Sequence, residues 1–247
     1  MIIKQTNLNL VYPRISLNNE HINNFEDVSN EYFLPPTILQ ISEQVHDEVP
    51  RIIAQTKNGH SMLNIALSVA SFTTDYNDDF VSNWDKCEKY LKLRCSNVYN
   101  IINHMINSNN TFVGLVTNVE IDDLDEKGVE VLKKSLCAEE AKKMGDIYDL
   151  SCKLTYVYKN QYFINITLQN LREFSIQQYS NGRTCITKEL KHTVFVSIDV
   201  NDRYAANNDS TYKSEKTAFD EILKITSDII NNKIEDLVKK GEFAYAE

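Results

Sequence analysis

Residues 58–72 read NGHSMLNIALSVASF, and this stretch decides how we expect the first half of the chain to fold. Asn58-Gly59 favours the two positive φ angles of a type I′ turn, and apolar residues alternate after it, which is typical of a strand. The residues expected on the buried face are Leu63, Ile65, Leu67 and Val69. We therefore predict an antiparallel pair made by residues 49–56 and 62–72, with one face on the core.

Two long helices are predicted from apolar residues at spacings of three and four. The first covers residues 79–106, and the second covers residues 214–240. The apolar positions of the first are Phe80, Trp84, Cys87, Leu91, Cys95, Val98, Ile102 and Met105, and those of the second are Phe219, Ile222, Ile225, Ile229 and Leu237. Neither helix can bury such a stripe alone, so each is expected to cover a sheet.

Further strands are predicted around these helices. Residues 112–121 read as a strand, and residues 148–200 hold several β-like runs, with Lys159-Asn160 as a hairpin tip. Residues 45–107 and 148–240 share an order, which is strands, then a polar turn, then a long helix. This order indicates either an internal duplication or two similar supersecondary units. The predicted fold is a single α+β domain over residues 1–247, with antiparallel β-sheet packed against two long helices.

The charge and the apolar runs of the chain indicate which kinds of partner to expect. The net charge is −9 and the isoelectric point is about 5.1, so no overall positive field attracts a phosphate backbone. Nucleic acid is therefore an unlikely partner. The first residues, MIIKQTN, lack a basic region followed by a long apolar run, and no stretch has the length needed to span a bilayer. We expect a cytoplasmic protein without a membrane partner.

Acidic residues at the ends of predicted strands are the candidate metal ligands. Glu120 belongs to one group, with Asp122 and Asp123, and Asp199 and Asp202 form another. Converging carboxylates are what Mg²⁺ prefers in many phosphoryl-transfer sites. The alternative is that these carboxylates cap the following helices or remain solvated, as is usual in an acidic protein.

No motif identifies a catalytic residue or a cofactor. The sequence contains no GxSxG, GxxxxGK[ST] or GxGxxG, and its 6 glycines leave little material for a phosphate-binding loop. The 5 histidines are scattered, without the spacing of a zinc site. We expect no cofactor, and the catalytic residues, if there are any, are unknown.

The order of features resembles a sporadically distributed family of uncharacterised bacterial proteins of about this size. The resemblance rests on residues 63–72, on Tyr76 and Phe80, on residues 112–121 and on residues 195–199. It implies a setting among mobile and defence-associated genes, and it implies no activity. The chain departs from the family at residues 114–118, which read GLVTN and lack the arginine-tyrosine signature expected on that strand.

Three functions from different classes follow from these observations. The first is a non-catalytic module that pairs with itself or with a protein partner, in a bacterial defence or toxin-neutralising system. The second is a metal-dependent hydrolase of phosphodiesters or nucleotides that uses Asp199, Asp202 and Glu120. The third is a holdase of the SecB type, which would hold unfolded chains on its sheet and grooves.

Overall fold

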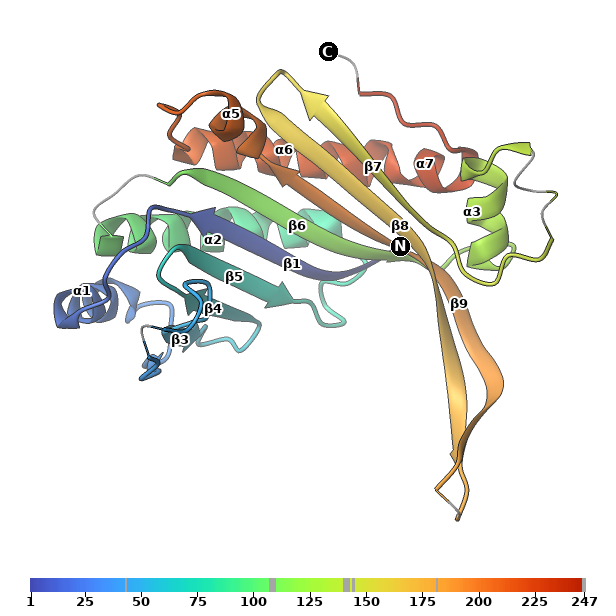
Figure 1. Cartoon of the computed structure of the whole chain (residues 1–247), viewed down its shortest axis with the longest axis horizontal. Helices are drawn as coiled ribbons and strands as arrows, with labels where there is room; N and C mark the ends of the chain where they lie inside the picture. Colours follow the sequence, from blue (N-terminus) through green and yellow to red (C-terminus); the bar gives the residue numbers. More distant parts are fainter. Residues whose placement is uncertain (43, 107–109, 140–142, 144, 181, 246–247) are drawn as a thin grey trace.

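The computed structural model describes residues 1–247 except 43, 107–109, 140–142, 144, 181 and 246–247, and it confirms the predicted α+β class. One antiparallel sheet of 9 strands has the order β2-β3-β4-β5-β1-β6-β9-β8-β7 (Figure 1). The strands are β1 (Ile2–Val11), β2 (Thr37–Ile38), β3 (Ile52–Gln55), β4 (Ser61–Ile65), β5 (Val69–Asp75), β6 (Phe112–Ile121), β7 (Ser151–Tyr158), β8 (Tyr162–Gln178) and β9 (Thr184–Asn201). The helices are α1 (Asn19–Ser29), α2 (Trp84–Ile106), α3 (Gly128–Leu136), α5 (Arg203–Asn208), α6 (Lys216–Asn232) and α7 (Ile234–Lys240).

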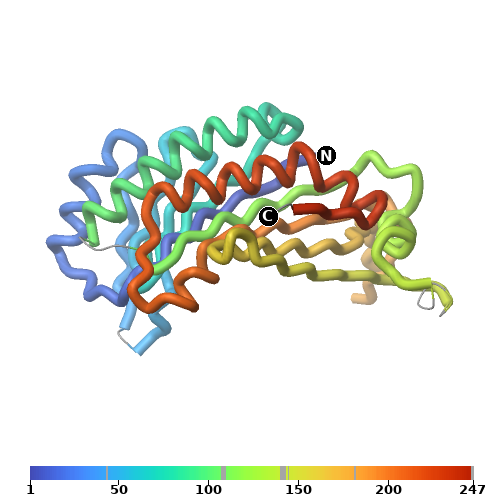
Figure 2. The backbone as a smooth tube through the Cα atoms, turned by 90° about the horizontal axis from the view of Figure 1, so that it is seen from above, coloured from blue at the N-terminus to red at the C-terminus, as the bar shows by residue number. Residues whose placement is uncertain are grey.

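The helices α2 and α6 lie next to each other on one face of the sheet (Figure 2). Buried apolar side chains from both helices and from the strands beneath them form one cluster. Two hydrogen bonds join α2 to the C-terminal part of the chain: Trp84 Nε1 donates to Ser227 Oγ at 3.0 Å, and the Tyr99 hydroxyl donates to the carbonyl of Ser214 at 2.8 Å. The opposite face of the sheet is only half-buried along β8 and β9, where buried and half-buried residues alternate.

Two hairpin predictions are confirmed, but the turn at Asn58-Gly59 is of another type than predicted. β3 pairs with β4 around Asn58-Gly59, yet only Gly59 has a positive φ, of 76°, so this turn is not the predicted type I′. The turn is closed instead by the amide of Gly59, which donates to the carbonyl of Thr56 at 2.8 Å. Lys159 and Asn160 have φ values of 52° and 47°, so the β7–β8 hairpin has the two positive φ angles.

The prediction of one strand over residues 62–72 is wrong. The chain turns at residues 66–68, where the amide of Ala66 donates to the carbonyl of Val69 at 2.8 Å, and β4 and β5 then pair with each other. Ala66 and Leu67 are buried although they lie in the turn. An unbroken apolar run therefore concealed a hairpin.

The predicted helix over residues 214–240 is two helices. α6 ends before Lys233, whose φ of −130° interrupts the helical backbone, and α7 follows directly. Gly241 ends α7 with a φ of 73°, in the left-handed region that glycine adopts without strain. None of the helices within the described ranges is long and apolar enough to cross a membrane.

Candidate functional site

A two-stranded ribbon projects from the sheet (Figure 1). β7 accompanies β8 only as far as Gln169, and β6 accompanies β9 only as far as Val194. Beyond these residues, the structure pairs the described parts of β8 and β9 with each other alone, up to Gln178 and Thr184. We call residues 170–193, without the undescribed position 181, the ribbon. The ladder between β6 and β9 and the ladder between β7 and β8 both end before the ribbon begins.

Two irregularities in the ladder bend the ribbon away from the sheet. The pairing shifts between Glu173 and Phe174 and again between Ser175 and Ile176. The shifts leave Leu190 and Thr187 of β9 without opposite residues. An extra residue on one strand of an antiparallel pair increases the local twist and bends the strand, so these positions set the direction of the ribbon.

The base of the ribbon is held by charged and aromatic contacts. The guanidinium of Arg172 donates to both carboxylate oxygens of Glu189, at 2.8 and 3.0 Å. The same guanidinium lies 4.4 Å from the centre of the Tyr148 ring and 4.9 Å from that of Phe174. Hydrogen bonds from Arg172 lower the pKa of Glu189, so the pair stays charged. These contacts hold the base of the ribbon in place, and they lie at the end of the ribbon next to the sheet.

The first residue of α3 also packs on the base. A Cβ atom placed on Gly128 would lie 2.4 Å from the carbonyl oxygen of Thr193, so only glycine allows this approach of α3 to β9. α3 thereby covers one side of the ribbon where it leaves the sheet.

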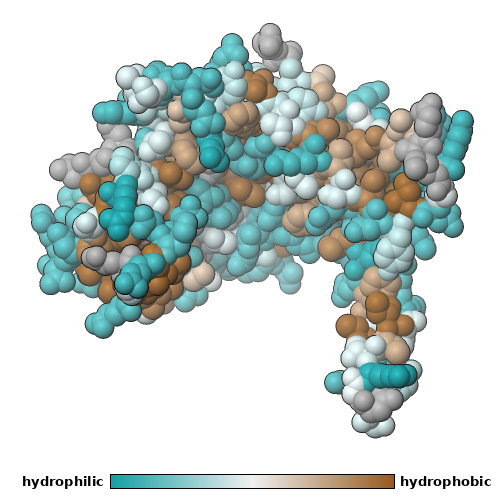
Figure 3. Space-filling view, in the orientation of Figure 1, coloured by the Kyte–Doolittle hydropathy of each residue, from teal (hydrophilic) through white to brown (hydrophobic). Residues whose placement is uncertain are grey.

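Beyond its base the ribbon exposes large apolar side chains. Ile176 and Ile186 lie directly opposite each other in the ladder and are 66% and 63% exposed. Leu171, Tyr179 and Leu190 on the same ribbon are also exposed. Figure 3 shows a brown, apolar area on the projecting arm. A two-stranded hairpin is marginally stable in water by itself, and clustered apolar residues on a surface are typical of an interaction site.

Glu120, one of the predicted metal ligands, lies where the ribbon meets the sheet. A cavity of about 260 Å³ in this corner is lined by Lys4, Glu120, Leu171, Glu173, Lys191, Thr193 and Phe195. The Glu120 carboxylate accepts from Lys4 Nζ at 2.7 Å and from Lys191 Nζ at 2.5 Å. Burial alone would raise the pKa of Glu120, but hydrogen bonds from Lys191 and Lys4 outweigh it and lower the pKa to about 2. Glu120 therefore joins β1, β6 and the base of the ribbon as an ion pair.

Asp199 lies on the half-buried face of the sheet. It accepts from Asn165 Nδ2 at 3.1 Å and from Asn201 Nδ2 at 2.9 Å. Burial raises the pKa of Asp199 and these two amides partly offset it. Both oxygens of this carboxylate thus have donors from the chain itself.

Asp202 is fully buried after the end of β9. It accepts from the amide of Val113 at 2.7 Å, from the Tyr212 hydroxyl at 2.7 Å and from the Ser214 hydroxyl. Burial raises the pKa of Asp202, and these hydrogen bonds act in the opposite direction. This geometry gives Asp202 the role of joining β6 to the loop before α6.

The structure does not bring Glu120 together with the two aspartates. Asp199 pairs with Val116 on β6, and Glu120 lies four residues further along the same strand, which is about 13 Å at the usual rise of a strand. Among the residues that the structure describes, no group of three or more His, Cys, Asp or Glu side chains is placed to hold a metal ion. The metal site and the hydrolase remain predictions that a binding experiment has to test.

The sequence patterns predicted strands in the region of the ribbon but missed the ribbon itself. Alternation of apolar and polar residues is clear in residues 162–168 and is lost in residues 175–178, which read SIQQ. The difference in strand length that makes the ribbon is seen in the structure: β8 has 17 residues and β9 has 18, whereas β7 has 8. β8 and β9 continue past the ends of their ladders with β7 and β6 and pair with each other there.

The fold and this site define an α+β protein with one projecting, partly apolar ribbon. Comparison of the chain with models of known protein families finds no match, and comparison with curated proteins finds none either. The resemblance to the sporadically distributed bacterial family remains a prediction.

Proposed function

We propose that the chain is a non-catalytic protein-interaction module, and that the ribbon is the surface that binds a protein partner or a second copy of the chain. The observation that carries the proposal is the opposed pair of Ile176 and Ile186. It lies on a ribbon beside whose edges the described part of the chain places no strand of the sheet. A bound protein would cover the apolar pair and hydrogen-bond an open edge, as in recognition by strand addition.

We also infer that the chain consists of two similar units, with the ribbon as an addition to the second. The order of the strands supports this inference. Counted outward from the central pair β1 and β6, one side has β5, β4 and β3, with the two-residue β2 at its edge, and the other has β9, β8 and β7. Each set of three is followed along the chain by a long helix, α2 or α6, with the short α5 before the latter.

The two units differ most at one hairpin. β4 and β5 have 5 and 7 residues, while their counterparts β8 and β9 have 17 and 18. The first unit buries its sheet face without such an extension, so burial of the core does not require the ribbon. This difference favours a role for the ribbon in binding.

The proposal is tested by replacing Ile176 and Ile186 with threonine in one variant. Threonine retains the branched shape that suits a strand but adds a hydroxyl group, so the variant should fold and lose its apolar contact. The matched control is Val157→Thr, because Val157 is 42% exposed on the edge strand β7, outside the ribbon.

Each tagged protein would be captured from its native cells, and the mass of the eluted complex measured by light scattering. We expect a stoichiometric partner or a defined oligomer with the unchanged chain and with Val157→Thr, and a bare monomer with the double variant. Equal complexes with all three proteins would contradict the proposal, provided that circular dichroism shows the same fold.

A holdase of the SecB type is the second candidate, because exposed apolar side chains on the ribbon would also retain an unfolded chain. It requires that the protein suppress aggregation of a denatured client near equimolar ratio and that the double variant fail to do so. We also propose that the protein acts in a bacterial defence or toxin-neutralising system. This part of the proposal rests on the family resemblance alone.

A further inference from the structure

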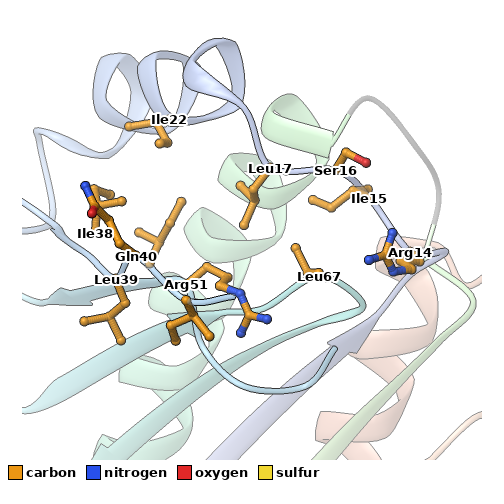
Figure 4. Close-up of a pocket in the computed structure, with 12 residues that line it drawn as sticks. Arg14, Ile15, Ser16, Leu17, Ile22, Ile38, Leu39, Gln40, Arg51 and Leu67 are labelled. Carbon is orange, nitrogen blue, oxygen red and sulfur yellow. The ribbon is translucent and has the colours of Figure 1, made fainter. Parts of the chain in front are cut away.

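A second site lies at the other end of the sheet, away from the ribbon. A cavity of about 240 Å³ is enclosed by residues 14–17, by α1 and by the chain from β2 to the start of β3. Figure 4 shows the side chains that line it, with Ile15 and Leu17 on one side of the space and Leu67 pointing towards them from the other. Most of these residues are aliphatic. The cavity is therefore suited to an apolar group.

The exception is Arg51, which lines the same cavity and is only 7% exposed. The backbone of Arg51 is fixed between two neighbours, since its amide donates to the carbonyl of Ile65 at 2.7 Å and its carbonyl accepts from the amide of Leu39 at 2.8 Å. Its guanidinium donates to the carbonyls of Val49 and Val45, the second at 3.4 Å. A guanidinium has five N–H donors, and among the described residues these two carbonyls are the acceptors it reaches.

The charge of Arg51 has no compensating charge in the described part of the chain. No carboxylate of a described residue lies within 4.0 Å of its guanidinium; the acidic residue at position 43 is outside that part. Burial of an unpaired charge is costly, and a buried guanidinium normally binds a carboxylate or a phosphate.

Arg14, the other arginine at this cavity, provides an internal comparison. Its Nε lies 2.9 Å from Asp47 Oδ2, and its side chain is 51% exposed. Arg14 is thus a paired surface charge, while Arg51 is a buried charge whose acceptors, within the described residues, are carbonyls. The cavity consequently combines an aliphatic wall with one positive group to which the described chain supplies no negative partner.

We propose that this cavity binds a small monocarboxylate with an aliphatic tail, whose carboxylate pairs with Arg51 and whose tail lies against Leu17, Ile22 and Leu39. A water molecule in the liquid takes about 30 Å³, so the space holds about eight non-hydrogen atoms. Hexanoate has that size. The planar guanidinium matches a carboxylate through two parallel hydrogen bonds, which distinguishes it from a lysine in the same place.

The test is titration calorimetry of the full chain with hexanoate and, as the matched ligand without a charge, with hexanol. The unchanged protein should bind hexanoate at least tenfold more tightly than hexanol. Arg51→Met, which preserves the unbranched stem, should remove this preference and leave the weak binding of hexanol unchanged. Inorganic phosphate should bind more weakly than hexanoate because it has no tail.

A second variant keeps the proposal falsifiable if Arg51→Met does not fold. Leu17→Trp fills the cavity from residues 14–17, outside the helices and strands, and should abolish binding of both organic ligands. Equal affinity for hexanoate and hexanol, equal affinity for phosphate and hexanoate, or unchanged hexanoate binding by Leu17→Trp would each overturn the assignment. None of these results depends on the ribbon, so they are independent of the interaction with a protein partner.

Discussion

Replacement of Asp202 by alanine should destabilise the fold more than any exposed substitution. Asp202 is fully buried and accepts three hydrogen bonds, from the amide of Val113 and from the hydroxyls of Tyr212 and Ser214. A hydrogen bond to a charged group contributes about 1.5–3 kcal/mol. The variant leaves the amide of Val113 without its side-chain acceptor inside the protein, which adds a desolvation cost.

The net loss is smaller than the sum of the three bonds. Burial raises the pKa of Asp202, which means that the buried carboxylate itself is partly unfavourable, and alanine removes that cost as well. We therefore expect the free energy of unfolding to fall by about 3–5 kcal/mol. For a chain of this length each kcal/mol lowers the melting temperature by about 2–4 °C, so a drop of roughly 10 °C should be seen.

The assay is urea unfolding followed by circular dichroism, with thermal melting beside it. Tyr212→Phe is the matched control, because it removes one of the three donors and leaves the carboxylate, and it should cost about 1 kcal/mol. Two results would refute this reasoning. One is a loss below about 1 kcal/mol for Asp202→Ala; the other is a rise in melting temperature with Mg²⁺ or Mn²⁺ that disappears in that variant, which would favour the hydrolase.

Three smaller effects are expected elsewhere. The folded pKa of Glu120, about 2 against an ordinary 4.5, means that its ion pairs stabilise the fold fully above about pH 4.5 and that this is lost as the pH falls towards 2. Because Lys191 is 39% exposed, screening by solvent reduces this loss of stability to about 1–2 kcal/mol. Urea titrations at about pH 6 and about pH 3 should show the loss, and Glu120→Gln should lack this pH dependence. Gly128→Ala places a Cβ atom 2.4 Å from the carbonyl oxygen of Thr193 and should cost about 1–3 kcal/mol in thermal unfolding; an unchanged melting temperature would mean that α3 does not approach β9 so closely. Asn160→Gly should raise the free energy of unfolding by about 0.5 kcal/mol, because glycine adopts the φ of 47° without strain, and a loss in urea unfolding would count against the turn geometry.

The sequence predicted those elements whose signals are local. Spacings of three and four revealed α2, and residues 159–160 were recognised as a hairpin tip. The hairpin between β4 and β5 was missed for an equally local reason. Its turn contains Ala66 and Leu67 and no glycine or proline, so the composition did not distinguish turn from strand.

The candidate sites depend on relations between distant parts of the chain, and only the tertiary structure decided them. Glu120 forms ion pairs with Lys4 and Lys191, each far away in sequence, so its acidic neighbours at positions 122 and 123 gave no indication of that partner set. The ribbon exists because β6 and β7 stop where β8 and β9 continue. Alternation within one strand reports which face is buried, but it contains no information about where the neighbouring strand ends.

The same distinction applies to Arg51. From the sequence alone, an arginine after Val49-Pro50 is an ordinary surface residue. Its burial and its lack of a carboxylate partner within the described residues arise because residues 14–17, α1 and the chain at β2 close around it. Composition and periodicity thus determined the class of the fold and the positions of most elements, since these depend on neighbours within a few residues. The ribbon, the ion pairs and the cavity were decided by long-range packing, because each is made of groups that only the folded chain brings together.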